Sequence, residues 1–196
     1  MANVSVFRWD DVGAPQILTG KPSEIFSILK AVLVDGYGSK QALGWSVSYE
    51  SSNPLAIIFK NNTLLGGSGS EIKFRAATNQ DPANGVIFGS SAYYFTDINN
   101  AYRQSGEHAF NAKSGVRAWI IIGNASGFYL IMSVHRQFVN SPSSKMAGVG
   151  SSSVHAYFGD FKSVFSNDPG RCIAIASYRA SHSSVGDSLT ENLGRI

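Results

Sequence analysis

The side chains that most often perform chemistry in proteins are present in this sequence, but not in the spacings that chemistry requires. The four histidines, His108, His135, His155 and His182, form no H-E-x-x-H, H-x-E or H-x-x-x-H pattern, so we expect no metal site. The single cysteine, Cys172, heads an apolar run typical of a buried strand and cannot form an intrachain disulfide. We therefore predict no catalytic residue, no metal and no cofactor.

The segments rich in glycine and serine also lack the context of a known site. Residues 66–70 (GGSGS) are not followed by Lys-Ser or Lys-Thr, and the next segment is predicted to be a strand, so a phosphate-binding loop is not indicated. Residues 148–151 come near the G-x-S-x-G nucleophile motif but place glycine where the serine should stand. The 13 acidic residues include no close pair on one strand face, as glycoside hydrolysis would need. No sequence feature indicates enzymatic activity.

Aromatic side chains are the remaining candidates for ligand binding. Tyr93, Tyr94 and Phe95 are consecutive, and in a strand Tyr93 and Phe95 face one side while Tyr94 faces the other. This pattern is typical of a sheet packed on both faces, which favours core or subunit interface over ligand stacking. The alternative is a carbohydrate-binding β-module, whose shallow groove would be lined by Trp9, Trp45, Tyr37 or Tyr94.

Composition narrows the class of protein. The chain has 196 residues, of which 43% are hydrophobic and 15% charged, so a sizeable core is possible. The net charge is +3, but the 16 Lys and Arg residues are scattered, and we expect no specific nucleic-acid binding. The longest apolar stretch is interrupted at residues 123–127, so no membrane span is expected.

Hydrophobic periodicity predicts one helix near the start of the chain. Apolar residues follow one another at helical spacing over residues 22–34, with Pro22 at the start, Glu24 in the first turn and Gly36 just beyond the end. We expect the apolar face of this helix to belong to the core.

The rest of the chain reads as short strands separated by Gly, Ser and Asn turns. The clearest hairpin pairs residues 116–122 with 128–134, and residues 71–75 alternate like a half-buried strand. Residues 101–114 could be a short helix or a long loop, and residues 137–153 show no pattern. The predicted fold is mainly β: an antiparallel β-sandwich or barrel with the helix packed on it. The other predicted strands are residues 44–49, 54–60, 86–95, 154–158 and 171–177.

We expect one β-rich domain, residues 21–178, between two extended arms. The front arm is residues 1–20 and the rear arm is residues 179–196, and both have few apolar residues. Arms of this kind can add strands to the sheet edge of a neighbouring subunit. Their apolar residues would be the protein–protein anchors: Val4, Val6, Phe7 and Trp9 in front, and Leu189, Leu193 and Ile196 behind.

Five residues are expected to specify the fold at its turns. Gly36 and Gly38 can adopt positive φ and would end the helix with two sharp turns. Trp45 would begin the first sheet strand and pack under the helix. Gly159 and Asp160 would form a tight turn, in which the Asp160 carboxylate bonds the local backbone.

Three segments carry a resemblance to a known family. They are residues 25–45 (IFSILKAVLVDGYGSKQALGW), residues 157–163 (YFGDFKS), and residues 117–122 (RAWIII) with Phe128, Tyr129 and Leu130. Over residues 22–179 the chain resembles a family of virion structural proteins of tailed bacteriophages. These motifs are not catalytic signatures, so the resemblance implies membership of a phage particle and no activity.

The resemblance implies a structural subunit that is made in the cytoplasm of the bacterial host and incorporated into the virion. A position in the tail baseplate or tail tip is favoured, and a neck, collar or head-surface subunit is the alternative. The partners would be other virion subunits, including a homo-oligomeric ring, reached by oligomerisation and arm exchange. Low charge density agrees with this, because interface cores are depleted in charge.

Overall fold

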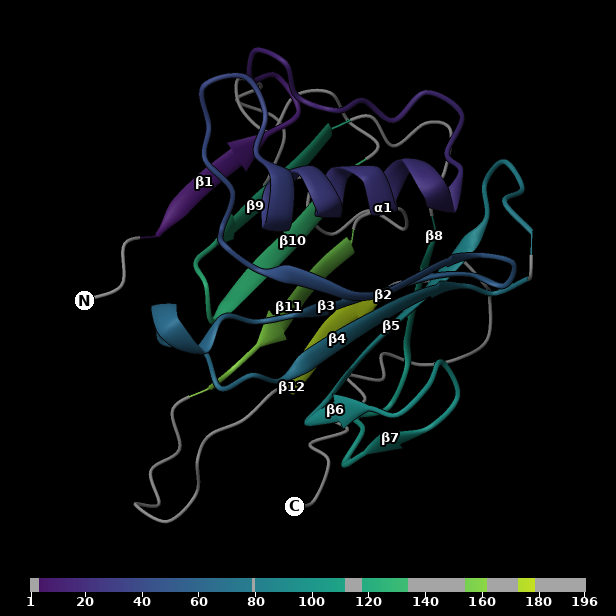
Figure 1. The fold of residues 1–196 in the computed structure, drawn as a ribbon. Helices are drawn as coiled ribbons and strands as arrows, with labels where there is room; N and C mark the ends of the chain where they lie inside the picture. The colour runs from purple at the N-terminus through teal and green to yellow at the C-terminus, as the bar shows by residue number, and fades with distance from the viewer. Residues whose placement is uncertain (1–3, 79, 112–117, 134–153, 162–172, 179–196) are drawn as a thin grey trace.

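The computed structural model describes residues 4–78, 80–111, 118–133, 154–161 and 173–178. It consists of two five-stranded antiparallel sheets, a small two-stranded sheet and one helix (Figure 1). The elements are β1 (Ser5–Arg8), α1 (Pro22–Lys30), η1 (Ala31–Asp35), β2 (Ser46–Ser52), β3 (Leu55–Lys60), η2 (Thr63–Leu65), β4 (Glu71–Ala76), β5 (Val86–Ala92), β6 (Tyr94–Phe95), β7 (Ala101–Tyr102), β8 (His108–Asn111), β9 (Ala118–Gly123), β10 (Gly127–Ser133), β11 (Val154–Gly159) and β12 (Ile173–Tyr178).

The two large sheets form a sandwich, which confirms the predicted mainly β fold and selects the sandwich over the closed barrel. The strand order is β1-β9-β10-β11-β12 in one sheet and β2-β3-β4-β5-β8 in the other. The predicted hairpin is present as β9 and β10, with Ile121 opposite Leu130 and Trp119 opposite Met132. These four side chains are buried and face the other sheet, because alternate residues of a strand share a face.

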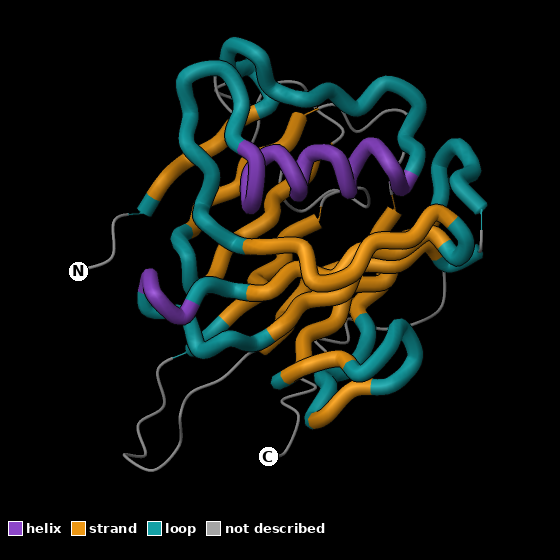
Figure 2. Tube along the Cα trace, viewed as in Figure 1, coloured by secondary structure: helices purple, strands orange, loops and turns teal. Residues whose placement is uncertain are grey.

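The predicted helix is also present and lies across one open side of the sandwich (Figures 1 and 2). Its buried residues Ile25, Ile28 and Leu29 belong to the same core cluster as the strands, as the helical spacing predicted. Glu24 fixes the start of the helix, because its carboxylate accepts hydrogen bonds from the backbone N–H groups of Thr19 (2.9 Å) and Gly20 (2.8 Å). The helix continues past Lys30 as the π-helical turn η1.

The end of the helix shows why glycine stands there. Gly36 has φ of +79° and its N–H donates to the carbonyl of Ala31 (2.7 Å), which closes the π turn. Gly38 also has positive φ, as predicted. Trp45 lies one residue before β2, and its backbone N–H donates to the carbonyl of Leu33 in the last helical turn (2.9 Å). Trp45 is buried in the core, as predicted.

An aromatic cluster fills the centre of the sandwich. Phe74 from β4 contacts Phe59, Phe110 and Phe158, and its ring centroid is 4.9 Å from that of Phe158 on the facing sheet. All four rings are buried, and edge-to-face contacts of this kind add to the free energy gained by burial. The two sheets therefore share one core.

The structure corrects the predicted front arm. Residues Ser5–Arg8 are not free but form β1, which pairs with β9 of the same chain, and Phe7 is buried in the core. Ile17 is buried as well. The low apolar content of this segment predicted that it would not fold on the domain, but Phe7 and Ile17 are both buried in the core. Residue 20 is therefore not a boundary of the fold.

The outer backbone edge of β1 is also largely occupied. Lys40 Nζ donates to the carbonyl of Val6 (2.6 Å), and the N–H of Arg8 donates to the carboxylate of Asp11 (2.7 Å). Lysine at a sheet edge hinders pairing with a further strand. Strand exchange through this end of the chain is therefore not supported by the structure.

Two further predictions need correction. Residues 101–114, expected to be a short helix or a long loop, contain the strands β7 and β8 in their described part. Residues 71–75, expected to be half-buried, are almost wholly buried, because the chain from residue 93 to 107 covers the outer face of β4. The rear arm, residues 179–196, and the segment 137–153 lie outside the described residues.

Candidate functional site

The outer face of β4 carries three charged side chains in a row. Glu71, Lys73 and Arg75 alternate with the core residues of this strand and so point away from the sandwich. Glu71 and Lys73 are nevertheless buried. Burying a charge is unfavourable unless it is paired and hydrogen-bonded. The hydrogen-bond partners of these three side chains therefore indicate the role of the outer face of β4.

All three charges bind the segment that covers them. The Glu71 carboxylate accepts a hydrogen bond from the N–H of Phe95 (2.7 Å), and Lys73 Nζ donates to the carbonyl of Ile98 (2.9 Å). Lys73 Nζ also lies 5.0 Å from the centroid of the Phe95 ring, a cation–π contact. The charged row thus fastens the β6–β7 hairpin to the sheet.

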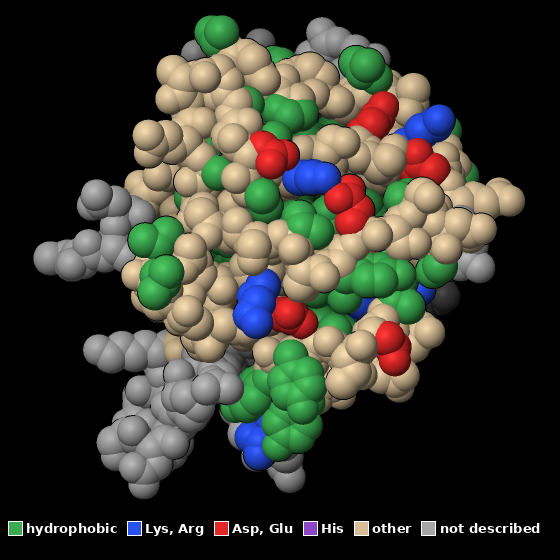
Figure 3. Space-filling view, in the orientation of Figure 1, with side chains coloured by type: hydrophobic (Ala, Val, Ile, Leu, Met, Phe, Trp, Pro, Cys, Tyr) green, Lys and Arg blue, Asp and Glu red, His purple; other side chains and the backbone are tan. Residues whose placement is uncertain are grey.

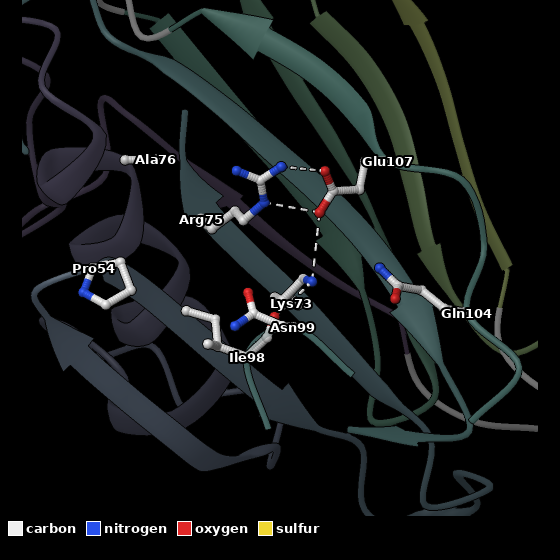
Figure 4. Close-up of a pocket in the computed structure, with 8 residues that line it drawn as sticks. All are labelled: Pro54, Lys73, Arg75, Ala76, Ile98, Asn99, Gln104 and Glu107. Carbon is white, nitrogen blue, oxygen red and sulfur yellow. Dashed lines mark hydrogen bonds and ion pairs between the residues drawn. The ribbon is translucent and has the colours of Figure 1, made fainter. Parts of the chain in front are cut away.

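Glu107 neutralises the two cations of the row (Figure 4). Arg75 donates two hydrogen bonds to its carboxylate, one of them from Nε at 2.9 Å, and Lys73 Nζ lies 3.5 Å from the same carboxylate. Hydrogen bonds from Arg75 hold the pKa of Glu107 below its usual value. Burial lowers the pKa of Lys73, although attraction to Glu107 acts in the opposite direction.

A cavity of about 490 Å³ opens beside this network. It lies between Pro54 in the β2–β3 turn, the β4 cations, and Ile98 and Asn99 in the β6–β7 turn (Figure 4). A buried lysine with a lowered pKa beside a cavity is one pattern of an active site. Here, however, the Lys73 amine already donates to Ile98 and faces Glu107, which is the geometry of a tether rather than of a free nucleophile.

The hairpin held by this network presents aromatic side chains to solvent. Tyr94 and Tyr102, which face each other across β6 and β7, are 49% and 48% exposed, and their rings are stacked with centroids 5.5 Å apart. The guanidinium of Arg103 lies 5.4 Å from the ring centroid of Tyr93 and 5.5 Å from that of Tyr102. Figure 3 shows this apolar group over β6 and β7, with a basic side chain at its edge.

A second polar cluster lies where the β3–β4 loop meets the end of β11. The Asp160 carboxylate accepts hydrogen bonds from the N–H and Oγ of Ser68 (2.7 and 2.6 Å), from Ser70 Oγ (2.8 Å) and from Asn61 Nδ2 (2.8 Å). These partners of the Asp160 carboxylate lie far away in sequence, which the predicted role in a local turn did not include. Gly159 is the last residue of β11 and has φ of +137°, and the turn predicted there continues into residues that the structure does not describe.

This cluster fixes a loop that exposes two leucines. Leu64 and Leu65 form most of the short helix η2 and are 92% and 56% exposed. The Asn62 side chain accepts from the N–H of Leu64 (2.9 Å) and donates to the carbonyl of Gly44 (3.0 Å), which anchors the loop next to η2. An apolar pair on a rigid loop is the kind of surface that binds another protein.

The residues predicted as interface anchors lie in different environments. Val4 and Val6 are exposed, so they remain candidates for an interface. Phe7 is buried and Trp9 is partly buried against the core, so the prediction fails for Phe7. The predicted rear anchors, Leu189, Leu193 and Ile196, lie outside the described residues.

The residues suggested for a carbohydrate groove do not share a surface. Trp45 is buried, with its indole N–H donating to the carbonyl of Asn124 (3.0 Å). Tyr37 and Trp9 pack against the core, and only Tyr94 lies on an exposed surface. Of the residues suggested for this groove, Tyr94 therefore remains exposed enough to contact a ligand.

Sequence reasoning missed Lys73, Glu107, Tyr102 and Arg103. The sequence did contain a signal for Lys73. Charges of both signs alternate with apolar residues in residues 71–75 (EIKFR), a pattern that fits charges paired with another segment as well as charges exposed to solvent. Glu107, Tyr102 and Arg103 lie in the segment to which no element could be assigned, and nothing in the sequence places them over β4.

Within the described residues, no group of three or more His, Cys, Asp or Glu side chains could hold a metal ion. In the same part of the chain, no helix has the length and apolar character needed to span a membrane. His135, His182 and Cys172 lie outside the described residues. The chain has no significant match to any family model, curated protein or solved structure that we compared it with.

Proposed function

We propose that this protein is a structural subunit of a tailed-bacteriophage virion that acts by assembling with other subunits. The observation that carries the proposal is the pair of exposed leucines, Leu64 and Leu65, on a loop that Asp160 and Asn62 hold rigid. A rigid loop loses little conformational entropy when a partner covers it, which favours association. The resemblance of residues 22–179 to phage virion proteins is the reason for proposing a phage particle as the assembly.

Assembly through preformed surfaces is the form of association that we propose. Because β1 is paired and its outer edge is occupied by Lys40 and Asp11, the front of the chain is an integral part of the subunit. Contacts between preformed surfaces therefore have more support here than exchange of the front arm. Exchange through residues 179–196, and a location in the baseplate or tail tip, remain proposals that rest on the sequence.

The test is to weaken the leucine pair and measure assembly. Burying one exposed leucine contributes roughly 1.5–3 kcal/mol, so Leu64→Ser should weaken the self-association or partner binding of this subunit at least about tenfold. Leu18→Ser is the matched control, since Leu18 is exposed but lies in the loop before α1. Analytical ultracentrifugation of the protein and incorporation into phage particles would be measured for both variants.

Two results would count against the proposal. The first is unchanged assembly of the Leu64→Ser, Leu65→Ser double variant, which would show that the leucine pair is not an interface. The second is an intact-virion map that contains no density for this fold. Either would leave the fold as described and remove the assigned role.

A further inference from the structure

The outer face of the β1-β9-β10-β11-β12 sheet is apolar, unlike the charged outer face of β4. Ile121 and Leu130 belong to the core, so the residues next to them in β9 and β10 point outward. Outward positions of an antiparallel sheet are commonly polar, because they contact water. Six outward positions of this sheet are apolar instead, and together they are called the outer apolar face: Val6, Ile120, Ile122, Tyr129, Ile131 and Tyr157.

The six side chains form two adjoining rows across the sheet. The first row runs from β1 to β11 and consists of Val6, Ile122, Tyr129 and Tyr157, each opposite the next. The centre of the second row is Ile120 and Ile131, with Arg8 and His155 on either side of them. Apolar side chains thus occupy the middle of the face and polar ones part of its border, which is the arrangement of an interface core and rim.

The outer apolar face is open to solvent at two of its strands. Tyr129 in β10 and Val6 in β1 are 55% and 44% exposed, and the other four side chains are half-buried among their neighbours. A continuous apolar run such as residues 119–122 (WIII) is typical of a strand that is covered on both faces. We therefore expect a second layer to cover this sheet.

The chemistry of the face favours another sheet over a loop as this layer. A loop carries backbone N–H and C=O groups that need partners, and β4 provides them for its own covering segment through Glu71 and Lys73. The six residues of the outer apolar face include no charged side chain that could fasten a loop in this way. A sheet needs no such partners, because its backbone groups are paired within it and it presents side chains alone.

The size and charge of the face fit a second copy of the same chain. Five strands about 4.8 Å apart and about six residues long cover on the order of 500 Å². Two such faces would bury about 1,000 Å² in total, which reaches the lower size limit of specific protein interfaces. Arg8 is paired with Asp10 of its own subunit (2.8 Å), so its charge is already balanced when two copies meet.

We propose that two copies of this protein associate face to face through their outer apolar faces, related by a two-fold axis. Each copy offers the same surface to the other, as in most protein dimers. Leu64 and Leu65 are not among the residues of this face, so the inference does not depend on the leucine pair that carries the proposed function.

The experiment is analytical ultracentrifugation of the full-length protein, with thermal unfolding measured on the same samples. An interface of this size is expected to give a dimer Kd on the order of 10 µM. Tyr129→Glu should raise this Kd about 100-fold, because each dimer would bury the new charge twice. Val6→Ser should raise it about tenfold, since less apolar surface is buried. Tyr102→Glu is the matched control and should leave it unchanged, because Tyr102 is a half-exposed tyrosine of β7 that also stacks on a second tyrosine ring.

Three results would overturn the proposal. A wild-type protein that stays monomeric at about 200 µM has no interface of this strength. Unchanged association of Tyr129→Glu, with association lost in the Leu64→Ser, Leu65→Ser double variant, would assign the dimer to the leucine pair. A monomeric wild type together with a lower melting temperature of Tyr129→Glu would show that the chain itself covers the face. Failure of the leucine test alone would leave the face-to-face dimer supported.

Discussion

Glu107→Gln is the change that tests most directly how the hairpin is held on the sheet. The substitution keeps the shape of the side chain and removes its charge. Arg75, which is about one-third exposed, can turn toward water, but Lys73 is only 3% exposed. The ammonium of Lys73 would therefore remain buried without its nearest carboxylate, beside the Ile98 carbonyl and the Phe95 ring.

The expected loss can be bounded from the geometry. Removing one partner of a fully buried ion pair costs about 3–5 kcal/mol, because the other charge is left uncompensated. The Glu107 side chain is 28% exposed and its 3.5 Å separation from Lys73 is longer than a close pair, so water and distance reduce this effect. We expect Glu107→Gln to lower the free energy of unfolding by about 2–3 kcal/mol.

The assay is urea unfolding at pH 7 of wild type, Glu107→Gln, Lys73→Met and the double variant. Lys73→Met leaves Glu107 paired with Arg75 and places an apolar chain against Phe95, so its effect should be smaller. If Lys73 is the charge left uncompensated, the double variant will be less destabilised than the sum of the single variants, by at least about 1 kcal/mol. Strict additivity would refute the pairing of Lys73 with Glu107.

Acid pH supplies a second check on the same carboxylate. The pKa of Glu107 in the folded protein lies below its ordinary value of 4.5, so this group binds fewer protons in the folded than in the unfolded state. Its contribution is therefore complete above the unfolded pKa and is lost as pH falls through the lower, folded value. The stability difference between wild type and Glu107→Gln should shrink below pH 4.5, and a constant difference would contradict the assignment.

Three other predictions concern the loops. Asp160→Ala should lower stability by about 3 kcal/mol in urea unfolding, because the buried hydroxyl of Ser70 loses a charged acceptor, and Asp160→Asn should recover little of it. Gly159→Ala should reduce the melting temperature, since a Cβ there would overlap Gly127 and the backbone has φ of +137°; an unchanged value would be contrary to this. Burial raises the pKa of Tyr37, and its hydrogen bond to Asp11 adds to this effect. Tyr37 therefore ionises at lower pH in the unfolded protein, so the free energy of unfolding should fall as pH rises above 10. The Tyr37→Phe variant should lack this contribution to the pH dependence.

Periodicity and turn residues were sufficient for the parts of the fold that depend on local chemistry. The helix was predictable because its apolar residues recur at helical spacing, and Pro22 and Gly36 mark its ends through backbone geometry alone. The β9–β10 hairpin was predictable because two apolar runs flank a short loop containing glycine. Both features depend on neighbours in sequence.

The environment of the charged row was not predictable, because it depends on a distant segment. Alternation in residues 71–75 correctly places Ile72 and Phe74 in the core. The same alternation is expected whether the outer face of the strand contacts water or is covered by another segment. Glu107 lies 32 residues beyond Arg75, and no local pattern indicates that the two form an ion pair. The candidate site was therefore missed where tertiary contacts decide burial.

The front of the chain was misjudged for a related physical reason. Its low apolar content predicted an arm, since few side chains are available to offset the entropy of ordering. In the structure two of those side chains, Phe7 and Ile17, are buried almost completely, and backbone pairing with β9 adds hydrogen bonds that composition does not record. Average apolar content is thus a weak guide for a segment that contributes a strand to an existing sheet.

The surfaces around Leu64 and around Tyr94 share one property that sequence patterns do not report, which is exposure combined with rigidity. Leu64 and Tyr94 would ordinarily be assigned to a core, and both are exposed because polar contacts made by other residues hold their loops away from it. Asp160, directly after β11, and Lys73, in β4, add further contacts of this kind. Replacing Asp160 should therefore impair assembly through Leu64 and Leu65 without removing any group that touches a partner, and this separates support from contact at that surface.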